Sequence, residues 1–390
     1  MRKVVVDNYI LIFIICQVML NNISVAGIVA EYNPFHYGHI HHINETKKHC
    51  DAVVAVMSGN FVQRCEPAVC DKHARAQSAV LGGADLVIAL PARYSLGSAE
   101  KFAYGAVSLL DSLGFVDILS FGSESGDISR IISSAEKIDR ISPDEYKAPS
   151  FRGKGFARIR SEITGEEQQG PNDVLATEYV RALKKLHSNI RPFCIKRTDG
   201  YIESATAIRE KIKKGDLSSL PDFSAEILKK EIDAERAPAD MSNIERVILG
   251  FIRNATPDAF ENIYGVNTKE GIDKRILSAA KASSLNELYS LIKTKQLTSS
   301  AVRRAVISLY LRLKNEPYAP VPFVHVLAFS ETGKILIKAI PEDIAVVSNM
   351  SKIKDIYPEY ADEERRTTDL FYLSTPSAGE GYTEFTRKFQ

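Results

Sequence analysis

The first half of the chain alternates short apolar runs with longer stretches of helical spacing. The apolar runs are residues 23–30, 52–57, 85–90, 117–121 and 193–196, and helical stretches such as 74–81, 100–113 and 173–186 lie between them. The runs are nearly continuous in apolar residues, which is typical of strands buried on both faces of a sheet. This order predicts an α/β fold with a Rossmann-like, parallel five-stranded sheet over residues 23–214.

The pattern of apolar and polar positions changes after Gly215. Residues 217–314 have helical spacing, polar faces and no further alternation of strands and helices. Thr298 or Ser299 can cap a helix with one apolar stripe, and the stripe consists of Val302, Ala305, Val306, Leu309 and Leu313. We therefore predict a mostly helical C-terminal domain over residues 215–390.

Two further apolar runs, 323–329 and 334–339, flank Glu331-Thr332-Gly333. The short polar link predicts either a hairpin or a small α/β cap at this place.

Residues 1–22 are interpreted as an N-terminal extension. Arg2 and Lys3 precede an apolar run at residues 10–15, which resembles a secretory signal. The run is too short to span a bilayer, and no clean small-residue cleavage site follows it. We expect no stable membrane partner.

Composition narrows the function classes. A chain of 390 residues with 45% hydrophobic and 25% charged residues is ordinary for a globular protein of two domains. The net charge of +1 excludes a globally basic nucleic-acid binder, so any basic surface must be local. Five irregularly spaced cysteines argue against a disulfide framework and favour a reducing, cytoplasmic location.

The most informative motif is EYNPFHYGH at residues 31–39, between the first predicted strand and a helical stretch at 40–48. A helix N-terminus offers free N–H groups and a positive dipole end to a phosphate. Gly38 lets the phosphate approach the backbone, and the imidazoles of His36 and His39 can donate to phosphoryl oxygens as charge builds up. This predicts an enzyme that attacks the α-phosphate of ATP.

Two other interpretations of the histidines remain open. His36, His39, His41, His42 and His49 could form a metal cluster or simply begin a solvated helix. Metal sites usually recruit cysteine or carboxylate ligands at regular spacing, and none surrounds these residues. We therefore predict no metal ligands in the protein.

Polar, charged and glycine residues of the kind found in ligand sites also follow the other predicted strands. Ser58, Gln63 and Arg64 lie after the second strand, Gly122 follows the fourth and Arg197 follows the fifth. Open α/β sheets bind ligands outside the carboxyl ends of their strands. Residues 58–64 are therefore a candidate substrate loop, and Gly122 and Arg197 are candidates for the nucleotide site.

Two helix starts could add polar contacts. Ser204 can cap a helix whose first-turn amides, with Thr206 and Arg209, would form an anion site. Asn172, in Pro171-Asn172-Asp173, could contact adenine or a ribose hydroxyl. The alternatives are an ordinary cap and ordinary turn chemistry.

A basic cluster lies in the helical region. Residues 271–314 contain nine Lys and Arg against two acids, which fits an RNA-backbone surface in an otherwise neutral protein. The alternative is a solvated helical face. The candidate RNA contacts are Lys281, Lys293, Lys295, Arg303 and Arg304.

Segments 30–39, 57–64, 66–68, 121–124 and 204–209 together closely resemble the bacterial tRNA(Met) cytidine acetate ligases. The resemblance covers residues 25–214 and extends more loosely to about residue 314. It implies a nucleotidyltransferase-like domain followed by a smaller helical domain. It also implies that ATP and acetate, with Mg²⁺ on the triphosphate, are used to acetylate N4 of the wobble cytidine of elongator tRNA(Met).

The resemblance also implies roles for individual residues. Ser204, Thr206 and Arg209 would hold the β- and γ-phosphates, and His36 and His39 would be catalytic. The residues that would line the ATP site are Val29, Ala30, Glu31, Tyr32, Asn33, Pro34, Phe35, His36, Tyr37, Gly38, His39, Ile40, His41, His42, Gly122, Asn172 and Arg197.

The chain departs from the family pattern in a few places. Cys65 stands where the family usually has glycine, Asp173 replaces a usual second asparagine, and the extension before Val25 is not typical. Two other functions stay open: a small-molecule adenylyltransferase, and a non-catalytic protein that binds a nucleotide and RNA.

Overall fold

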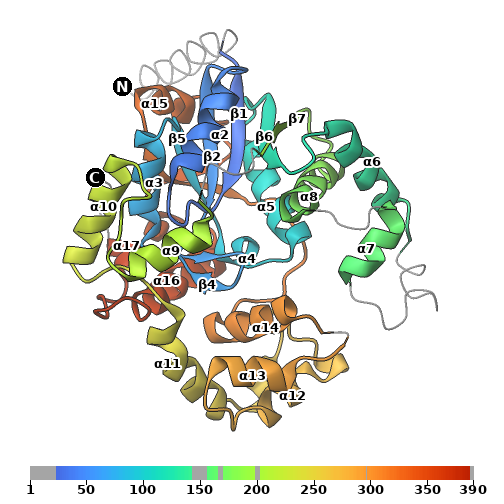
Figure 1. Ribbon diagram of the computed structural model, residues 1–390, viewed down its shortest axis with the longest axis vertical. Helices are drawn as coiled ribbons and strands as arrows, with labels where there is room; N and C mark the ends of the chain where they lie inside the picture. The colour runs from blue at the N-terminus through green and yellow to red at the C-terminus, as the bar shows by residue number, and fades with distance from the viewer. Residues whose placement is uncertain (1–22, 143–155, 166–169, 198–202, 296, 387–390) are drawn as a thin grey trace.

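A seven-stranded sheet with strand order β7-β6-β1-β2-β5-β8-β9 forms the centre of the molecule (Figure 1). The computed structural model describes residues 23–142, 156–165, 170–197, 203–295 and 297–386; the predicted extension, 1–22, lies outside them. The strands are β1 (Val25–Ala30), β2 (Ala52–Ser58), β5 (Leu86–Leu90), β6 (Ile118–Ser123), β7 (Arg191–Lys196), β8 (Phe323–Phe329) and β9 (Ala345–Val347).

The five strands predicted from the sequence are all present and mutually parallel. β1 pairs with β2 from Val25↔Ala52 onward and with β6 on its other side, while β5 and β7 extend the sheet outward. Every residue of β2 and of β5 is buried, which explains their uninterrupted apolar sequence. The Rossmann-like parallel sheet is thus confirmed.

The sheet nevertheless has two strands more than predicted. β8 pairs antiparallel with β5, with Leu86 opposite Phe329, and β9 lies parallel to β8. Of the two alternatives predicted here, the hairpin is wrong, because residues 334–338 lie in helix α15 (Glu331–Lys338), which Ser330 caps. The order β8–α15–β9 is of the α/β kind, but it extends the main sheet instead of forming a separate cap. β8 is buried over Phe323–Leu327, and its neighbours in the sheet are β5 and β9.

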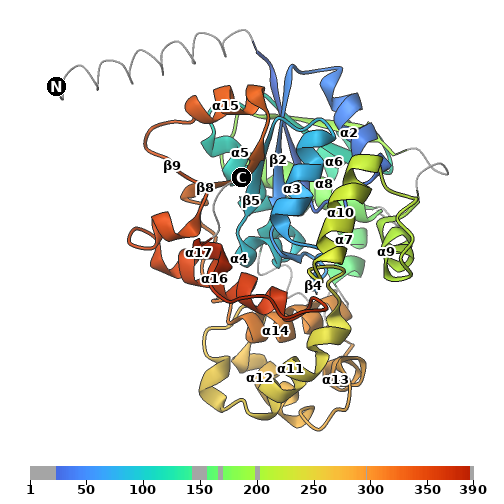
Figure 2. The ribbon, with the colours of Figure 1, turned by 90° about the vertical axis from the view of Figure 1, so that its left-hand side faces the viewer.

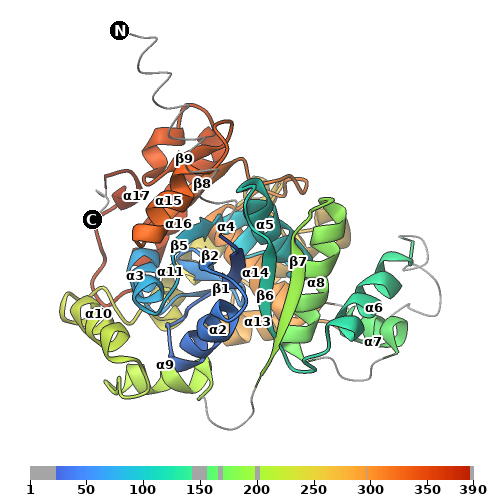
Figure 3. The ribbon, with the colours of Figure 1, turned by 90° about the horizontal axis from the view of Figure 1, so that it is seen from above.

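Each face of the sheet has its own hydrophobic core. On one face, Val54 and Val56 pack with helices α5 (Ala99–Ser112) and α8 (Pro171–Lys185). On the other face, Val53 and Ala55 pack with α2 (Tyr37–Lys47) and α3 (Lys72–Leu81). This alternation along one strand is the period of two expected of a central strand. Figure 3 shows the two helix layers from above.

The helical unit, residues 241–311, lies at one end of the molecule (Figures 1 and 2). Its helices are α11 (Met241–Arg253), α12 (Ile272–Ser278), α13 (Leu285–Ile292) and α14 (Ser299–Leu311). The cap and apolar stripe predicted for α14 are confirmed: Thr298 accepts the amide of Ala301, and the whole stripe is buried.

The remaining elements are β3 (Phe61–Val62), β4 (Glu66–Pro67), α4 (Ala92–Ser95), α6 (Ile128–Asp139), α7 (Phe156–Thr164), α9 (Ala205–Lys213), α10 (Asp222–Asp233), α16 (Pro358–Tyr372) and α17 (Thr383–Thr386), with 3-10 turns at Pro257–Phe260, Thr268–Glu270 and Met350–Ile353. Some of them connect the sheet to the helical unit. Phe61, Leu96 and Phe371 share a core with the helical unit. No helix among the described residues is long and apolar enough to cross a membrane.

Candidate active site

The turn from β1 into α2 positions two histidines by hydrogen bonds of their own rings. His36 is the N-cap of α2, and its Nδ1 accepts the amide of Gly38 at 3.0 Å. The Nδ1 of His39 accepts the amide of His36 at 3.1 Å, and the two rings stack with centroids 3.8 Å apart. A nitrogen that accepts carries no proton, so both neutral rings are protonated at Nε2.

Both imidazoles are held in the neutral form. Burial, together with the charges of Arg197 and Arg209, lowers the pKa of His36 to about 4. Burial, with His36, His42 and Arg197 as neighbours, lowers the pKa of His39 well below its usual range. At neutral pH each ring therefore offers one N–H, at Nε2, and no hydrogen bond to either Nε2 is found among the described residues.

Buried side chains support this turn from beneath. Tyr32 and Phe35 are 2% and 1% exposed, and both rings contact the ring of His39. Asn33 is buried and its Oδ1 accepts the amide of Val69 at 2.7 Å. Gly82 makes room for Phe35, since a Cβ there would lie 2.2 Å from the ring. The imidazoles therefore rest on a buried aromatic layer, while Tyr37 is exposed at the surface of the turn.

Helix α9 brings the predicted anion-binding residues to the same turn. Ser204 caps α9, as predicted, by accepting the amide of Ala207. The guanidinium of Arg209 donates to the carbonyl of Asn33 at 2.9 Å and to Oγ1 of Thr206 at 3.2 Å. Segments 176 positions apart in the sequence thus meet at the carboxyl end of β1.

Arg197 completes the cationic side of the site. It is exposed at the end of β7, and its charge helps to lower the pKa values of His36, His39 and His42. A Cβ on Gly122 would lie 3.6 Å from its Cγ, so Gly122 lies directly beneath this arginine. The structure therefore brings Gly122, Arg197 and the histidine pair together.

The side chain of Asn172 forms a hydrogen bond within the protein. Its Nδ2 donates to Oε1 of Glu124 at 2.6 Å, while the amide of Asp173 donates to Oε2 of Glu124 at 2.9 Å. In return, Asp173 accepts the amides of Glu124 and Ser125. The aspartate that departs from the family pattern thus locks the end of β6 onto the start of α8.

The candidate substrate loop is an antiparallel hairpin of β3 and β4. The amide of Gln63 donates to Glu31 at 2.9 Å, which ties the hairpin to the histidine turn. Arg64 is exposed, whereas Ser58 is buried and no partner for its Oγ is found among the described residues. Cys65 has φ +62°, a left-handed conformation that favours glycine. This turn therefore has the shape that glycine would adopt.

Arg75 was not predicted, although it holds the site together. Its guanidinium is buried and donates to the carbonyls of Glu31, Ser58, Gly59 and Cys70. It thereby fixes the ends of β1 and β2 relative to each other. The sequence signal was a cation among small residues of α3, beside Ala74, Ala76 and Ala79, which are buried as well.

The remaining nucleotide candidates surround the turn. Val29 and Ala30 end β1 and are half-buried, Tyr37 is 52% exposed, and Ile40 and His41 are half-buried. His42 faces the sheet, where its Nε2 lies 3.1 Å from Oγ of Ser120.

The basic candidates of the helical unit fall into two groups. Lys281, Lys293 and Lys295 are exposed. Arg303 instead pairs with Glu66 of the hairpin, Nη1 to Oε1 3.4 Å, and Nε of Arg304 donates to the carbonyl of Leu96 at 3.0 Å. The two arginines therefore connect the helical unit to the sheet unit.

Among the described residues, no three His, Cys, Asp or Glu side chains gather as they would around a metal ion. The site instead offers N–H donors and guanidinium groups at the carboxyl edge of the sheet. Such a constellation can bind the phosphates of a nucleotide and stabilise negative charge on one of them.

Comparisons with known proteins agree with this chemistry. Residues 23–384 match the model of the HIGH nucleotidyl transferase family. The chain is 37% identical to the tRNA(Met) cytidine acetate ligase of Caldanaerobacter subterraneus subsp. tengcongensis, over 89% of this chain and 94% of that protein. It is also 37% identical to the enzyme of that name from Clostridium acetobutylicum, over 81% of this chain and 87% of that protein.

Solved structures of proteins similar to this chain point to the same family. The crystal structure of Thermotoga maritima TmcAL bound with alpha-thio ATP is similar with a TM-score of 0.85 and 32% identity, covering 93% of this chain and 98% of that one. An apo form of the same protein is similar with a TM-score of 0.82 and 31% identity, at the same coverage.

Proposed function

Since the chain belongs to the HIGH nucleotidyl transferase family, we propose that it is a tRNA(Met) cytidine acetate ligase. It activates acetate with ATP and transfers the acetyl group to N4 of the wobble cytidine of elongator tRNA(Met). Its relatives of that name match most of the chain, and a similar structure binds an ATP analogue. The reaction belongs to the cytoplasm, where tRNA is modified.

ATP lies across the carboxyl edge of the sheet in this proposal. The triphosphate meets the imidazoles at the start of α2 and the exposed guanidinium of Arg197 on one side. The backbone amides of His36, Gly38 and His39 are already bonded within the turn, so the imidazole N–H groups take the place of the free amides expected from the sequence. Thr206 and Arg209 of α9 hold the β- and γ-phosphates on the other side, and Ser204 sets the direction of α9 as its cap. Gly122 lies against the side chain of Arg197 and leaves the end of β6 without a side chain at this point.

Activation of acetate is the first step. A carboxylate oxygen of acetate attacks the α-phosphorus, the bond from that phosphorus to the bridging oxygen breaks, and pyrophosphate leaves with acetyl-adenylate remaining. His36 and His39 donate from Nε2 to the oxygens on which charge develops. Both rings are neutral and fixed before ATP binds, so little reorganisation opposes the transition state.

Transfer to RNA is the second step. The exocyclic amine of the cytosine attacks the acetyl carbon, the carbon–oxygen bond to AMP breaks, and the amine releases a proton. An anticodon base can reach the adenylate only when it is splayed out of its loop, where RNA sequence is usually read. The hairpin with Gln63 and Arg64 lies between the histidine turn and the helical unit, which suits it to receive that base.

Magnesium enters with the triphosphate. No described cluster of carboxylates could form a protein cage for it, and Mg²⁺ commonly binds through phosphates and waters. The protein residues near the phosphates supply positive charge and N–H groups, which complement a metal–triphosphate complex.

The observation that carries this proposal is the pair of Nε2–H donors on His36 and His39, for which the described part of the chain provides no hydrogen-bond acceptor. The test is to incubate the purified protein with labelled acetate, ATP and bulk tRNA, and then to digest the RNA. An acetylated cytidine in one tRNA is expected. Turnover of ATP with a small molecule in the absence of RNA would indicate an adenylyltransferase instead. ATP binding without acetate-dependent release of pyrophosphate would indicate a non-catalytic protein.

A further inference from the structure

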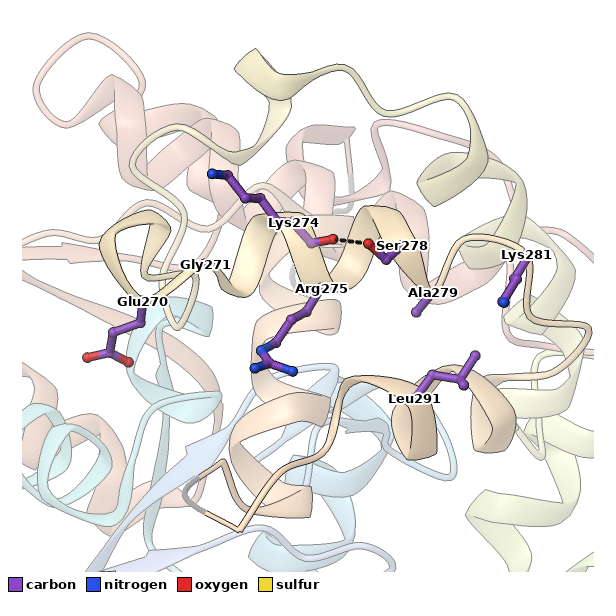
Figure 4. A pocket seen from close by; sticks show the side chains of 8 residues that line it. All are labelled: Glu270, Gly271, Lys274, Arg275, Ser278, Ala279, Lys281 and Leu291. Carbon is purple, nitrogen blue, oxygen red and sulfur yellow. Dashed lines mark hydrogen bonds between the residues drawn. The ribbon is translucent and has the colours of Figure 1, made fainter. Parts of the chain in front are cut away.

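A hollow of about 500 Å³ lies on the helical unit, between α12 and α13 (Figure 4). Its wall includes three cations, Lys274, Arg275 and Lys281, and one carboxylate, Glu270. A hollow of this size lies within the usual range for small-molecule sites, so it can take a nucleotide rather than only a single ion.

The three cations are available to a ligand. All three are exposed, and no side-chain hydrogen bond or ion pair of theirs is found in the described part of the chain. Lys281 is close enough to Glu287 to help lower the pKa of that carboxyl group. Glu287 itself is already bonded to the amide and the hydroxyl of Ser283.

The backbone that carries these cations is fixed. The guanidinium of Arg253 donates to the carbonyls of Ala280 and Ala282, at 3.2 Å and 2.8 Å, and thereby holds the residues on both sides of Lys281. Ser278 donates to the carbonyl of Lys274 at 2.8 Å within α12. These hydrogen bonds restrain the backbone on which the three cations stand.

The opposite wall is apolar. Leu291 of α13 is 47% exposed, and it lies across the gap from Arg275 and Lys281 (Figure 4). A cationic wall facing an exposed leucine complements a nucleotide, which combines an anionic phosphate with the flat apolar face of a base.

We propose that this hollow binds a nucleotide of the tRNA backbone. Arg275 and Lys281 bind the phosphate, Lys274 adds to the positive potential, and Leu291 packs against the base or ribose. The identity of the RNA as tRNA rests on the proposed function. The site anchors the RNA on the helical unit, whereas Arg303 and Arg304 are engaged with Glu66 and Leu96.

The test is the salt dependence of tRNA binding by the full-length protein. The triple variant Lys274→Ala/Arg275→Ala/Lys281→Ala should bind unfractionated tRNA about 10- to 100-fold more weakly at about 0.1 M salt, because phosphate contacts are lost. Each lost contact should also make the negative slope of log K against log salt shallower by about 0.7 to 0.9. Leu291→Ser should weaken binding without changing this slope, since it removes no charge.

The matched control is Lys229→Ala/Lys338→Ala/Lys352→Ala, which removes three exposed charges from α10, α15 and the 3-10 turn at Met350–Ile353. If the hollow variant has the same slope and affinity as this control, the hollow does not bind RNA. Acetate-dependent ATP–pyrophosphate exchange separates the two proposals. If the wild type catalyses exchange and the hollow variant keeps the wild-type salt slope, only the proposed RNA site in the hollow is overturned. If the wild type catalyses no exchange but the hollow variant has a shallower salt slope, only the proposed reaction is overturned.

Discussion

Lys72 and Glu384 form a buried ion pair across 312 positions of the sequence, with Nζ and Oε1 2.7 Å apart. Their side chains are 1% and 3% exposed. The amide of Lys72 also donates to Asn60, and Thr368 donates to the second oxygen of Glu384. Helices α16 and α17 therefore pack beneath the hairpin of the site, and they contact both the sheet unit, through Lys72, and the helical unit, whose core includes Phe371.

Glu384→Ala should destabilise the protein by about 3 kcal/mol, because the buried ammonium of Lys72 then keeps only the more distant carboxylate of Glu364, 3.9 Å away. Urea unfolding followed by circular dichroism measures this change. Glu380→Ala, at an exposed position of the same segment, is the control and should change the free energy of unfolding by less than about 0.5 kcal/mol. A loss below about 1 kcal/mol for Glu384→Ala would show that Glu364 replaces Glu384 as the partner of Lys72, and that the pair itself contributes little.

His39→Asn should separate the two roles of the ring. The Asn oxygen can replace Nδ1 as acceptor for the amide of His36, but no donor reaches the position of Nε2. We expect ATP–pyrophosphate exchange to fall about 10²- to 10³-fold, with an unchanged melting temperature and unchanged tRNA affinity.

His39→Ala should lose the exchange activity and also about 1 kcal/mol of stability, since it removes the acceptor as well. Parallel measurements of exchange and of tRNA binding check both variants. An equal loss of the two activities would contradict the assignment of His39 to the adenylation step.

The exchange reaction should show no acid limb near pH 6.5. Burial and two guanidinium groups lower the pKa of His36 to about 4. A depressed folded pKa means that the neutral ring contributes stability in full above pH 6.5, and that this contribution is lost as the pH falls through about 4. We expect a flat rate profile from pH 8 to about 5.5 and a decline below it.

Arg197→Met should move this decline to higher pH, because one of the two charges that oppose protonation of His36 is removed. The profile is measured at constant ionic strength and saturating ATP. An acid limb centred near 6.5 in the wild type would show that the ring is hydrated and titrates freely.

Cys65→Gly and Cys65→Ala should differ in stability. Alanine keeps the left-handed strain at φ +62° and loses the buried sulfur, so we expect a loss of about 1 kcal/mol. Glycine loses the same contacts but relieves about 1 kcal/mol of strain, so it should be close to neutral. Thermal unfolding of both variants checks this. If glycine is as destabilising as alanine, the turn is not strained.

The local elements of the site were predictable from sequence. The strand before residue 31, the helix after it, the cap at Ser204 and the stripe of α14 all depend on neighbours within a few positions. The additional strands were not predictable in this way. An apolar run such as 323–329 fits a hairpin, a cap or a sheet edge equally well. Only its antiparallel pairing with β5 in the folded protein shows which of them forms.

The sequence by itself determined the parallel α/β order and the histidine–glycine motif at a helix start, because side-chain period and capping are short-range properties. Tertiary structure decided which nitrogen of each histidine carries the proton, which cations remain free, and where Arg75, Glu384 and Arg303 find their partners. Those features depend on groups that are far apart in the chain and brought together by burial, and the pKa of an imidazole responds to that environment rather than to its sequence neighbours.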